Sequence, residues 1–176
     1  KAQVIQKKSE TLLKNTGTHE MKLSRHESDS LISTGLLGII TYDASGGILE
    51  DIINSGKIHI LKNDKLKNIL SNWGGILNDV KEDETWAVNE RNTITLPFLY
   101  RNSNYTNISG GMNYITDIPS GFNTDYRDIY KLREFENIVN SHRIWNKKNE
   151  NNYKRLKKRI EEIIILCEQD LKLKYK

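Results

Sequence analysis

The chain has 176 residues, of which 36% are hydrophobic and 28% charged, and its formal net charge is +4. Leu, Ile, Val and Phe supply 47 of the 176 residues. This share is above the roughly 20% that is typical of disordered chains, and it is enough for a hydrophobic core. A lone cysteine, Cys167, excludes an internal disulfide, and no apolar run reaches the ~18 residues of a membrane span.

Basic residues gather at both ends of the chain. Residues 1–25 carry a net charge of +4 and residues 147–176 carry +5, whereas residues 26–60 carry −4. Such ends favour phosphate-bearing partners or form a solvated helix face, and we favour the solvated face. Because the chain begins with Lys1 and shows no signal-peptide pattern, we expect it to be the soluble part of a longer protein.

The first forty residues predict helices. Residues 1–17 carry a narrow apolar stripe that ends at a glycine, which is typical of a helix with a glycine C-cap. Ser24 and Glu27 have the spacing of a capping box. The apolar run 31–40 then continues as a helix, in which two glycines, Gly35 and Gly38, allow close approach of a neighbouring element.

A short helix is predicted next, beginning at Asp43 or Ser45 and ending at Gly56. Residues 57–61 alternate apolar and polar side chains over too short a stretch for a sheet, and we expect an extended connection. The apolar face of the short helix comprises Ile48, Leu49, Ile52 and Ile53.

A long helix is predicted over residues 64–96, where apolar residues recur at steps of three and four. Gly74 and Gly75 weaken it by ~1 kcal/mol each relative to Ala, and Pro97 ends or kinks it. Acidic residues occupy the opposite face. Glu84 is the exception because it falls on the apolar stripe, where Arg91 or a cation from another helix could approach it.

Residues 101–125 are rich in Asn, Gly, Ser and Thr and predict a long irregular insert. Helical periodicity returns from about residue 126, with a turn expected at 146–152 before the last helix. Together these elements predict an all-α fold: a single domain over 1–176, built as an antiparallel bundle of about 4–6 helices.

Few residues suggest catalysis. His142 lies on an apolar face, where a core histidine is favoured over a pH-sensitive or catalytic group, and Cys167 lies among apolar neighbours rather than in an activating environment. The pairs His19-Glu20 and His26-Glu27 lack the zincin spacing. The basic run 154–159 has Tyr153 as its sole aromatic neighbour, which argues against nucleic acid. We therefore expect no catalytic residue, no metal and no cofactor.

The stretch 42–58 (YDASGGILEDIINSGKI) resembles a signature of an uncharacterised bacterial family of small proteins. Leu61 to Leu66, Trp73, Val80 to Glu84 and Leu132 to Asn140 continue the likeness. The motif positions that we regard as structural are Tyr42, Asp43, Gly47, Gly56 and Lys57. The resemblance implies a basic N-terminus, one transmembrane helix and a helical domain of unknown function, and it transfers no catalytic residue.

These observations favour a membrane-tethered, non-catalytic interaction or scaffold domain. The positive-inside rule would then place the domain in the periplasm, with the tether in the bacterial inner membrane. An unknown protein partner and a homo-oligomer are both open, and nucleic acid is not expected. The alternative is a ligand-sensing bundle in which the 101–125 loop forms a lid, with Tyr105, Tyr114 and Phe122 as the contact residues.

Overall fold

A computed structural model describes residues 2–17, 21–43, 47–110 and 120–174. Within those ranges the chain is helical and contains no β-strand, which confirms the predicted all-α bundle. The contacts divide the chain into unit 1, Lys1–Ile40 with Asp83–Glu150, and unit 2, Thr41–Glu82 with Asn151–Lys176. The boundaries fall inside two helices, α5 (Trp73–Glu90) and α8 (Arg133–Lys174), so each helix contributes to both units. The expectation of a single domain stays a prediction.

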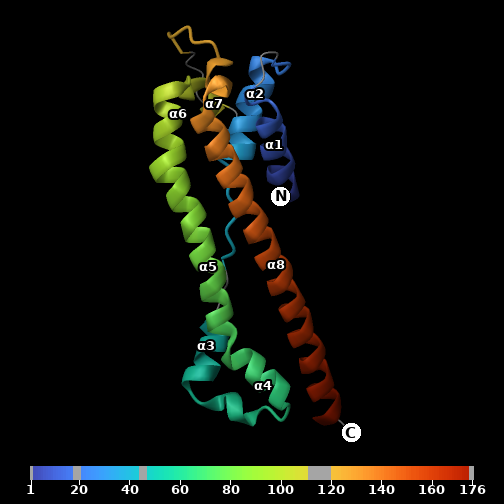
Figure 1. Ribbon diagram of the computed structural model, residues 1–176. Helices are drawn as coiled ribbons and strands as arrows, with labels where there is room; N and C mark the ends of the chain where they lie inside the picture. Colours follow the sequence, from blue (N-terminus) through green and yellow to red (C-terminus); the bar gives the residue numbers. More distant parts are fainter. Residues whose placement is uncertain (1, 18–20, 44–46, 111–119, 175–176) are drawn as a thin grey trace. The chain divides into compact units, whose positions relative to one another are not determined.

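Unit 1 holds the larger core, in which α6 and the C-terminal part of α5 run antiparallel to the N-terminal part of α8 (Figure 1). Phe98 stacks on Phe135 at 6.1 Å, and Trp86 stacks on Trp145 at 5.9 Å. The residue numbers of α5 and α6 therefore decrease along the direction in which those of α8 increase. The remaining elements of unit 1 are α1 (Ala2–Lys14), α2 (Arg25–Leu31), α6 (Leu96–Asn102), α7 (Tyr105–Gly110), π-helical segments Ile32–Leu36 and Arg91–Thr95, and the 3-10 segment Asp128–Lys131.

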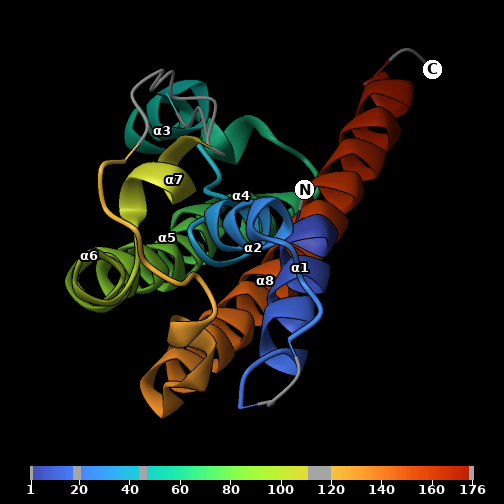
Figure 2. The same ribbon diagram turned by 90° about the horizontal axis from the view of Figure 1, so that it is seen from above.

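The predicted helix signals of α1 and α2 are confirmed. Gly17 adopts a φ of 67° after α1, and Ser24 and Glu27 form the capping box at the start of α2. Figures 1 and 2 show α1 lying beside the N-terminal part of α8. Leu12 of α1 is fully buried there in the core that contains Phe135.

Gly35 provides the predicted close approach. A Cβ atom on this residue would lie 2.7 Å from Cβ of Lys8, and Ser9 Oγ donates a hydrogen bond of 2.5 Å to the Gly35 carbonyl oxygen. The prediction that the helix continues to Ile40 is wrong, because the π-helical segment ends at Leu36. The wider π turn ends in a hydrogen bond from Leu37 N to the Ile32 carbonyl oxygen.

Unit 2 contains α3 (Gly47–Asn54), the 3-10 segment Lys57–Ile60, α4 (Asp64–Ser71) and the remaining parts of α5 and α8. Its buried cluster is small and comprises Leu66, Ile69 and Leu166. The short helix ends as predicted at Gly56, whose φ is 70°. The apolar face of α3 is not buried, and Ile48 at its start is 81% exposed.

Three further predictions between residues 57 and 97 differ from the structure. Residues 57–60 form a 3-10 turn instead of an extended connection, because the left-handed Gly56 turns the chain into local hydrogen bonding. The long helix breaks at Asn72, which caps α4 with bonds to the Asn68 carbonyl oxygen, and the glycine pair stays helical. Pro97 lies in the first turn of α6, where its missing N–H costs least.

The predicted turn at 146–152 is also wrong, because α8 is continuous there. Asn146 Nδ2 donates 3.0 Å to the His142 carbonyl oxygen one turn earlier, and Asn149 is 4% exposed. The asparagines are thus accommodated within the helix and its packing. The described part of 101–125 is likewise not wholly irregular, since it contains the end of α6 and all of α7.

Candidate functional site

A groove of about 880 Å³ lies within unit 2, between α8 and the α4–α5 region. Apolar side chains line much of it: Ile76, Val80, Leu156, Ile165 and Leu166. Polar and charged side chains supply the rest: Lys65, Asp79, Asn152, Arg155, Lys158, Arg159, Glu161, Glu162 and Gln169. The α8 contribution runs from Asn152 to Gln169, which at 1.5 Å per residue is a length of about 25 Å.

Ion pairs organise the charges at one edge of the groove. Lys65 Nζ lies 2.7 Å from Glu162 Oε1, and Arg159 Nη1 lies 2.8 Å from Glu162 Oε2. Hydrogen bonds from these two cations hold the pKa of the Glu162 carboxyl below its ordinary value. Glu162 therefore links α4 to α8 as a carboxylate.

Two other cations of the groove, unlike Lys65 and Arg159, are not paired with Glu162. Arg155 and Lys158 make no ion pair with any side chain that the structure describes, and both are exposed. Among the lining residues described, none is Ser, Thr, Cys or His, the side chains that most often act as nucleophiles or as bases near pH 7. The groove thus combines an apolar floor with positive charge that a bound partner can pair.

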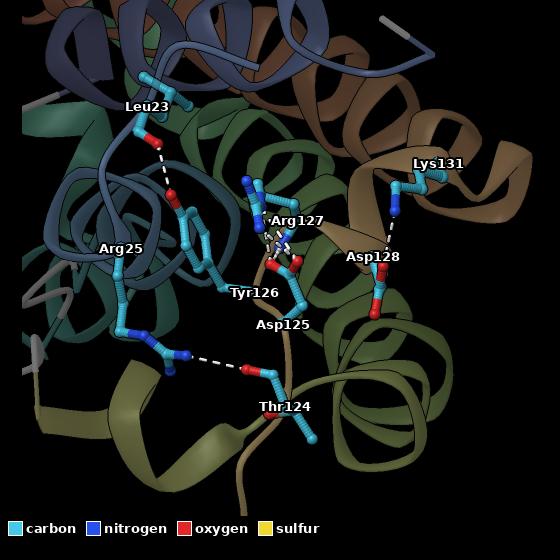
Figure 3. A network of polar contacts seen from close by, with 8 residues as sticks. All are labelled: Leu23, Arg25, Thr124, Asp125, Tyr126, Arg127, Asp128 and Lys131. Atoms are coloured by element: carbon cyan, nitrogen blue, oxygen red, sulfur yellow. Dashed lines mark hydrogen bonds and ion pairs between the residues drawn. The ribbon is translucent and has the colours of Figure 1, made fainter. Parts of the chain in front are cut away.

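A second group of polar contacts lies within unit 1, at the start of α2 (Figure 3). Arg127 donates to both oxygens of Asp125, from Nε at 2.9 Å and from Nη2 at 2.7 Å, and these bonds lower the pKa of Asp125 to about 2. Tyr126 donates its hydroxyl 2.8 Å to the Leu23 carbonyl oxygen. Arg25 donates 2.8 Å to the Thr124 carbonyl oxygen, and its guanidinium lies 5.4 Å from the Tyr126 ring centre.

These contacts attach residues 124–127 to the segment that enters α2. The hollow beside them measures about 20 Å³, which is room for roughly one water molecule. The network therefore holds two parts of unit 1 together, and the hollow that the described residues form beside it is small.

His142 lies inside unit 1 and is 5% exposed. The pKa of its imidazole is lowered to about 4, mainly by burial; the backbone of Gly35 and Gly38 offsets part of this effect, and the charge of Arg91 adds to it. Its Nε2 atom has no hydrogen-bond partner among the described residues. The ring is thus neutral near pH 7 and packs between elements that contain the two π-helical segments.

Of the predicted contact residues, the structure describes Tyr105 and Phe122, and neither lines the groove of unit 2. Tyr105 packs against the unit 1 core and makes an edge contact with Tyr100 at 4.8 Å, whereas Phe122 is 82% exposed. Tyr114 lies outside the described residues.

The family-like motif lies in unit 2. Tyr42 and Asp43 are exposed in the segment before α3, Gly47 begins α3, and Gly56 with Lys57 forms the turn into the 3-10 segment. None of these five motif residues lines the groove of unit 2. Of these positions, Gly56 turns the chain after α3 through its φ of 70°.

Other singled-out residues are dispersed. Glu84 is 5% exposed on α5, as expected from its place on the stripe, and Cys167 packs against the unit 2 cluster. His26 is exposed, while His19 and Glu20 lie outside the described residues. No group of three His, Cys, Asp or Glu side chains suited to a metal occurs in the described ranges.

Sequence reasoning did not identify the groove. Its lining comes from positions 65, 76–80 and 152–169, which are distant in the chain. The available signal was the apolar Ile165 beside the basic run 154–159, on a helix whose inward positions are already occupied by Leu156 and Leu166.

In comparisons with protein families, curated proteins and solved structures, no match to this chain was found. The resemblance to the uncharacterised bacterial family therefore stays a prediction. The helices that the structure describes include none with the length and apolar character required to cross a bilayer.

Proposed function

We propose that the protein is a non-catalytic protein-interaction module and that its unit 2 groove binds an amphipathic helix with acidic residues. The observation that carries this proposal is the composition of the groove, in which Ile165 and Val80 line an apolar floor beside two cations without ion pairs. Ile165 is 54% exposed although it is a large aliphatic side chain. Covering such a side chain with a partner's apolar face is favourable.

The shape and charge of the groove favour a helix as the occupant. About five helical turns of α8 form one wall, and an antiparallel or parallel helix can follow that length. Arg155 and Lys158 are positioned to pair with carboxylates on the flanks of such a helix. Lys65 and Arg159 already share Glu162, so they contribute less positive charge.

Fluorescence anisotropy with labelled model helices tests the proposal. The probe is a Leu-faced amphipathic peptide with Glu on its polar flanks, and the control peptide has Lys at the same positions. We expect saturable binding of the acidic peptide and at least about tenfold weaker binding of the basic one, because like charges repel across an interface. The double variant R155E/K158E should reverse this preference.

A matched pair of substitutions locates the site. Ile165→Glu places a charge in the groove and should abolish binding, whereas Ile164→Glu, at a residue 51% exposed that does not line the groove, should leave binding unchanged. Absence of saturable binding by the acidic peptide would refute the proposal. Equal losses in I164E and I165E would show that the groove is not the contact surface.

A small-molecule sensor is the second candidate, because about 880 Å³ lies within the range of ligand pockets. In this alternative the 101–125 loop forms the lid, with Tyr105, Tyr114 and Phe122 as contact residues. A thermal-shift titration with a medium-chain fatty acid, whose carboxylate matches Arg155, tests this alternative. A saturable rise in melting temperature that I165E removes would favour the sensor.

The membrane tether and the periplasmic location remain part of the proposal. The tether is proposed from the likeness to the bacterial family, and the periplasmic location from the positive-inside rule applied to a basic N-terminal region. Fractionation of bacterial cells that express the full-length protein tests both. Recovery in the soluble fraction, without detergent, would contradict the tether.

A further inference from the structure

A second apolar stripe runs along the unit 2 part of α8. Ile164 and Leu171 are 51% and 54% exposed, and Tyr153 and Ile160 on the same line are half-buried. At 100° per residue these four positions fall within about 20° of a single direction along the helix. The groove residue Ile165 points about 100° away from Ile164, so the stripe is a different face.

The stripe is symmetric about its own midpoint. Ile160 and Ile164 lie two residues before and after position 162, and Tyr153 and Leu171 lie nine residues before and after it. A second copy of the helix placed antiparallel would therefore set Ile160 opposite Ile164 and Tyr153 opposite Leu171. Each apolar residue would meet an apolar partner at both ends.

Charges of opposite sign lie on the two sides of the midpoint, within one residue of the same symmetry. Lys157 precedes position 162 by five residues, Glu168 follows it by six, and both side chains are exposed. Lys157 has a distant intrachain partner, Glu161, at 3.8 Å, and exposed pairs of this kind contribute little. In the antiparallel arrangement Lys157 of each copy lies beside Glu168 of the other.

From this juxtaposition we propose that the chain self-associates through residues 153–171 of α8, paired antiparallel with the same segment of a second copy. The charge order favours the antiparallel direction, because it sets Lys157 beside Glu168 of the other copy, whereas a parallel pair would leave these two positions on opposite sides of the interface and eleven residues apart along the helix. The exposed charges beside the stripe are of both signs, Lys157 with Glu161 and Glu168, which matches a second antiparallel copy better than a uniformly anionic membrane surface.

Sedimentation equilibrium of the 176-residue chain over a range of concentrations tests the pairing. We expect a reversible monomer–dimer equilibrium. Ile164→Glu should weaken the dimer by at least about tenfold, since it buries a charge at the centre of the stripe. Ile165→Glu is the matched control on the neighbouring face and should leave the dimer unchanged.

A charge exchange distinguishes the antiparallel pair from other dimers. K157E and E168K should each weaken association, because each creates like-charge neighbours across the pair. The double variant K157E/E168K should restore it to the wild-type level, which a parallel pair would not show. Far-UV circular dichroism verifies that each variant retains its helix content.

A wild-type chain that stays monomeric at every concentration would overturn the inference, as would a dimer that I164E does not weaken. Failure of the double variant to recover would overturn the antiparallel arrangement. These outcomes are independent of the peptide-binding assay, in which I165E is the sensitive variant, so the self-association and the proposed groove function fail separately.

Discussion

Replacing His142 with glutamine should make the stability of the protein less dependent on pH. The imidazole is 5% exposed, and burial holds its pKa at about 4 against an ordinary 6.5. Arg91 adds to this effect, and the backbone of Gly35 and Gly38 opposes it. Glutamine retains a polar side chain of similar length but does not titrate.

The sign follows from proton binding. Between pH 6.5 and about 4 the unfolded chain holds a proton on His142 that the folded chain does not hold. Stability therefore rises with pH in this window and is lost as the pH falls through it. The pKa of His142 is 6.5 in the unfolded chain and about 4 in the folded chain. This difference lowers the free energy of unfolding by about 3 kcal/mol once the pH has fallen below both values.

Asp29 acts in the opposite direction, because burial raises the pKa of its carboxyl above 3.8. Its folded form gains protons more readily, so its contribution is present at low pH and is lost as the pH rises through the raised pKa. The difference between wild type and H142Q removes this common background. Comparison of absolute profiles would not isolate His142.

Urea unfolding at pH 7.0 and 4.5 measures the effect. We expect the free energy of unfolding of the wild type to fall by about 2 kcal/mol more than that of H142Q over this interval. His26→Gln is the control for removal of an exposed histidine, and it measures separately any change that acts through the neighbouring Asp29. Parallel pH profiles for wild type and H142Q would refute the reasoning.

Three further substitutions test the packing of unit 1 by urea unfolding at pH 7. Gly35→Ala should destabilise by about 2 kcal/mol, because its Cβ would lie 2.7 Å from Lys8 Cβ, whereas the control Gly121→Ala, with no atom within 4 Å, should cost little. Ser24→Ala should cost about 1 kcal/mol through loss of the capping box, and a change below ~0.3 kcal/mol would show that the cap is not formed. Phe98→Ala should cost about 3–5 kcal/mol, because the ring is fully buried against Phe135, and a cost near zero would contradict that contact.

The features predicted correctly from sequence are those decided within a few residues. Ser24 and Glu27 form their box because both partners lie in one helical turn, and Gly17 and Gly56 adopt positive φ because glycine meets no Cβ penalty there. Gly35 is predicted as a close-approach position because it is a glycine within an apolar helical run. Its partner, Ser9, could not be identified, because the pairing depends on how α1 packs.

The features that sequence did not predict depend on contacts between distant segments. The π-helical turns at 32–36 and 91–95 have no distinctive composition, since i→i+5 bonding is selected by packing. The asparagines at 146–152 predict a break, but α8 is continuous there: Asn146 Nδ2 donates to the His142 carbonyl oxygen one turn earlier, whereas the buried Asn149 Oδ1 has no partner among the described residues and does not explain the continuity. The groove is likewise a tertiary feature, for which one exposed isoleucine was the available sequence signal.

Ile164 and Ile165 together decide whether α8 carries two specific surfaces or a generally adhesive one. They are neighbours of the same type with nearly equal exposure, 51% and 54%, so nonspecific hydrophobic association predicts that either glutamate substitution weakens both peptide binding and self-association. Their directions differ by about 100°, and Ile165 alone lines the groove. Specific surfaces therefore predict a crossed result, in which I165E affects peptide binding and I164E affects the dimer. Since each variant introduces the same charge into the same helix, a common effect on helix stability would change both assays together and could not produce the crossed pattern.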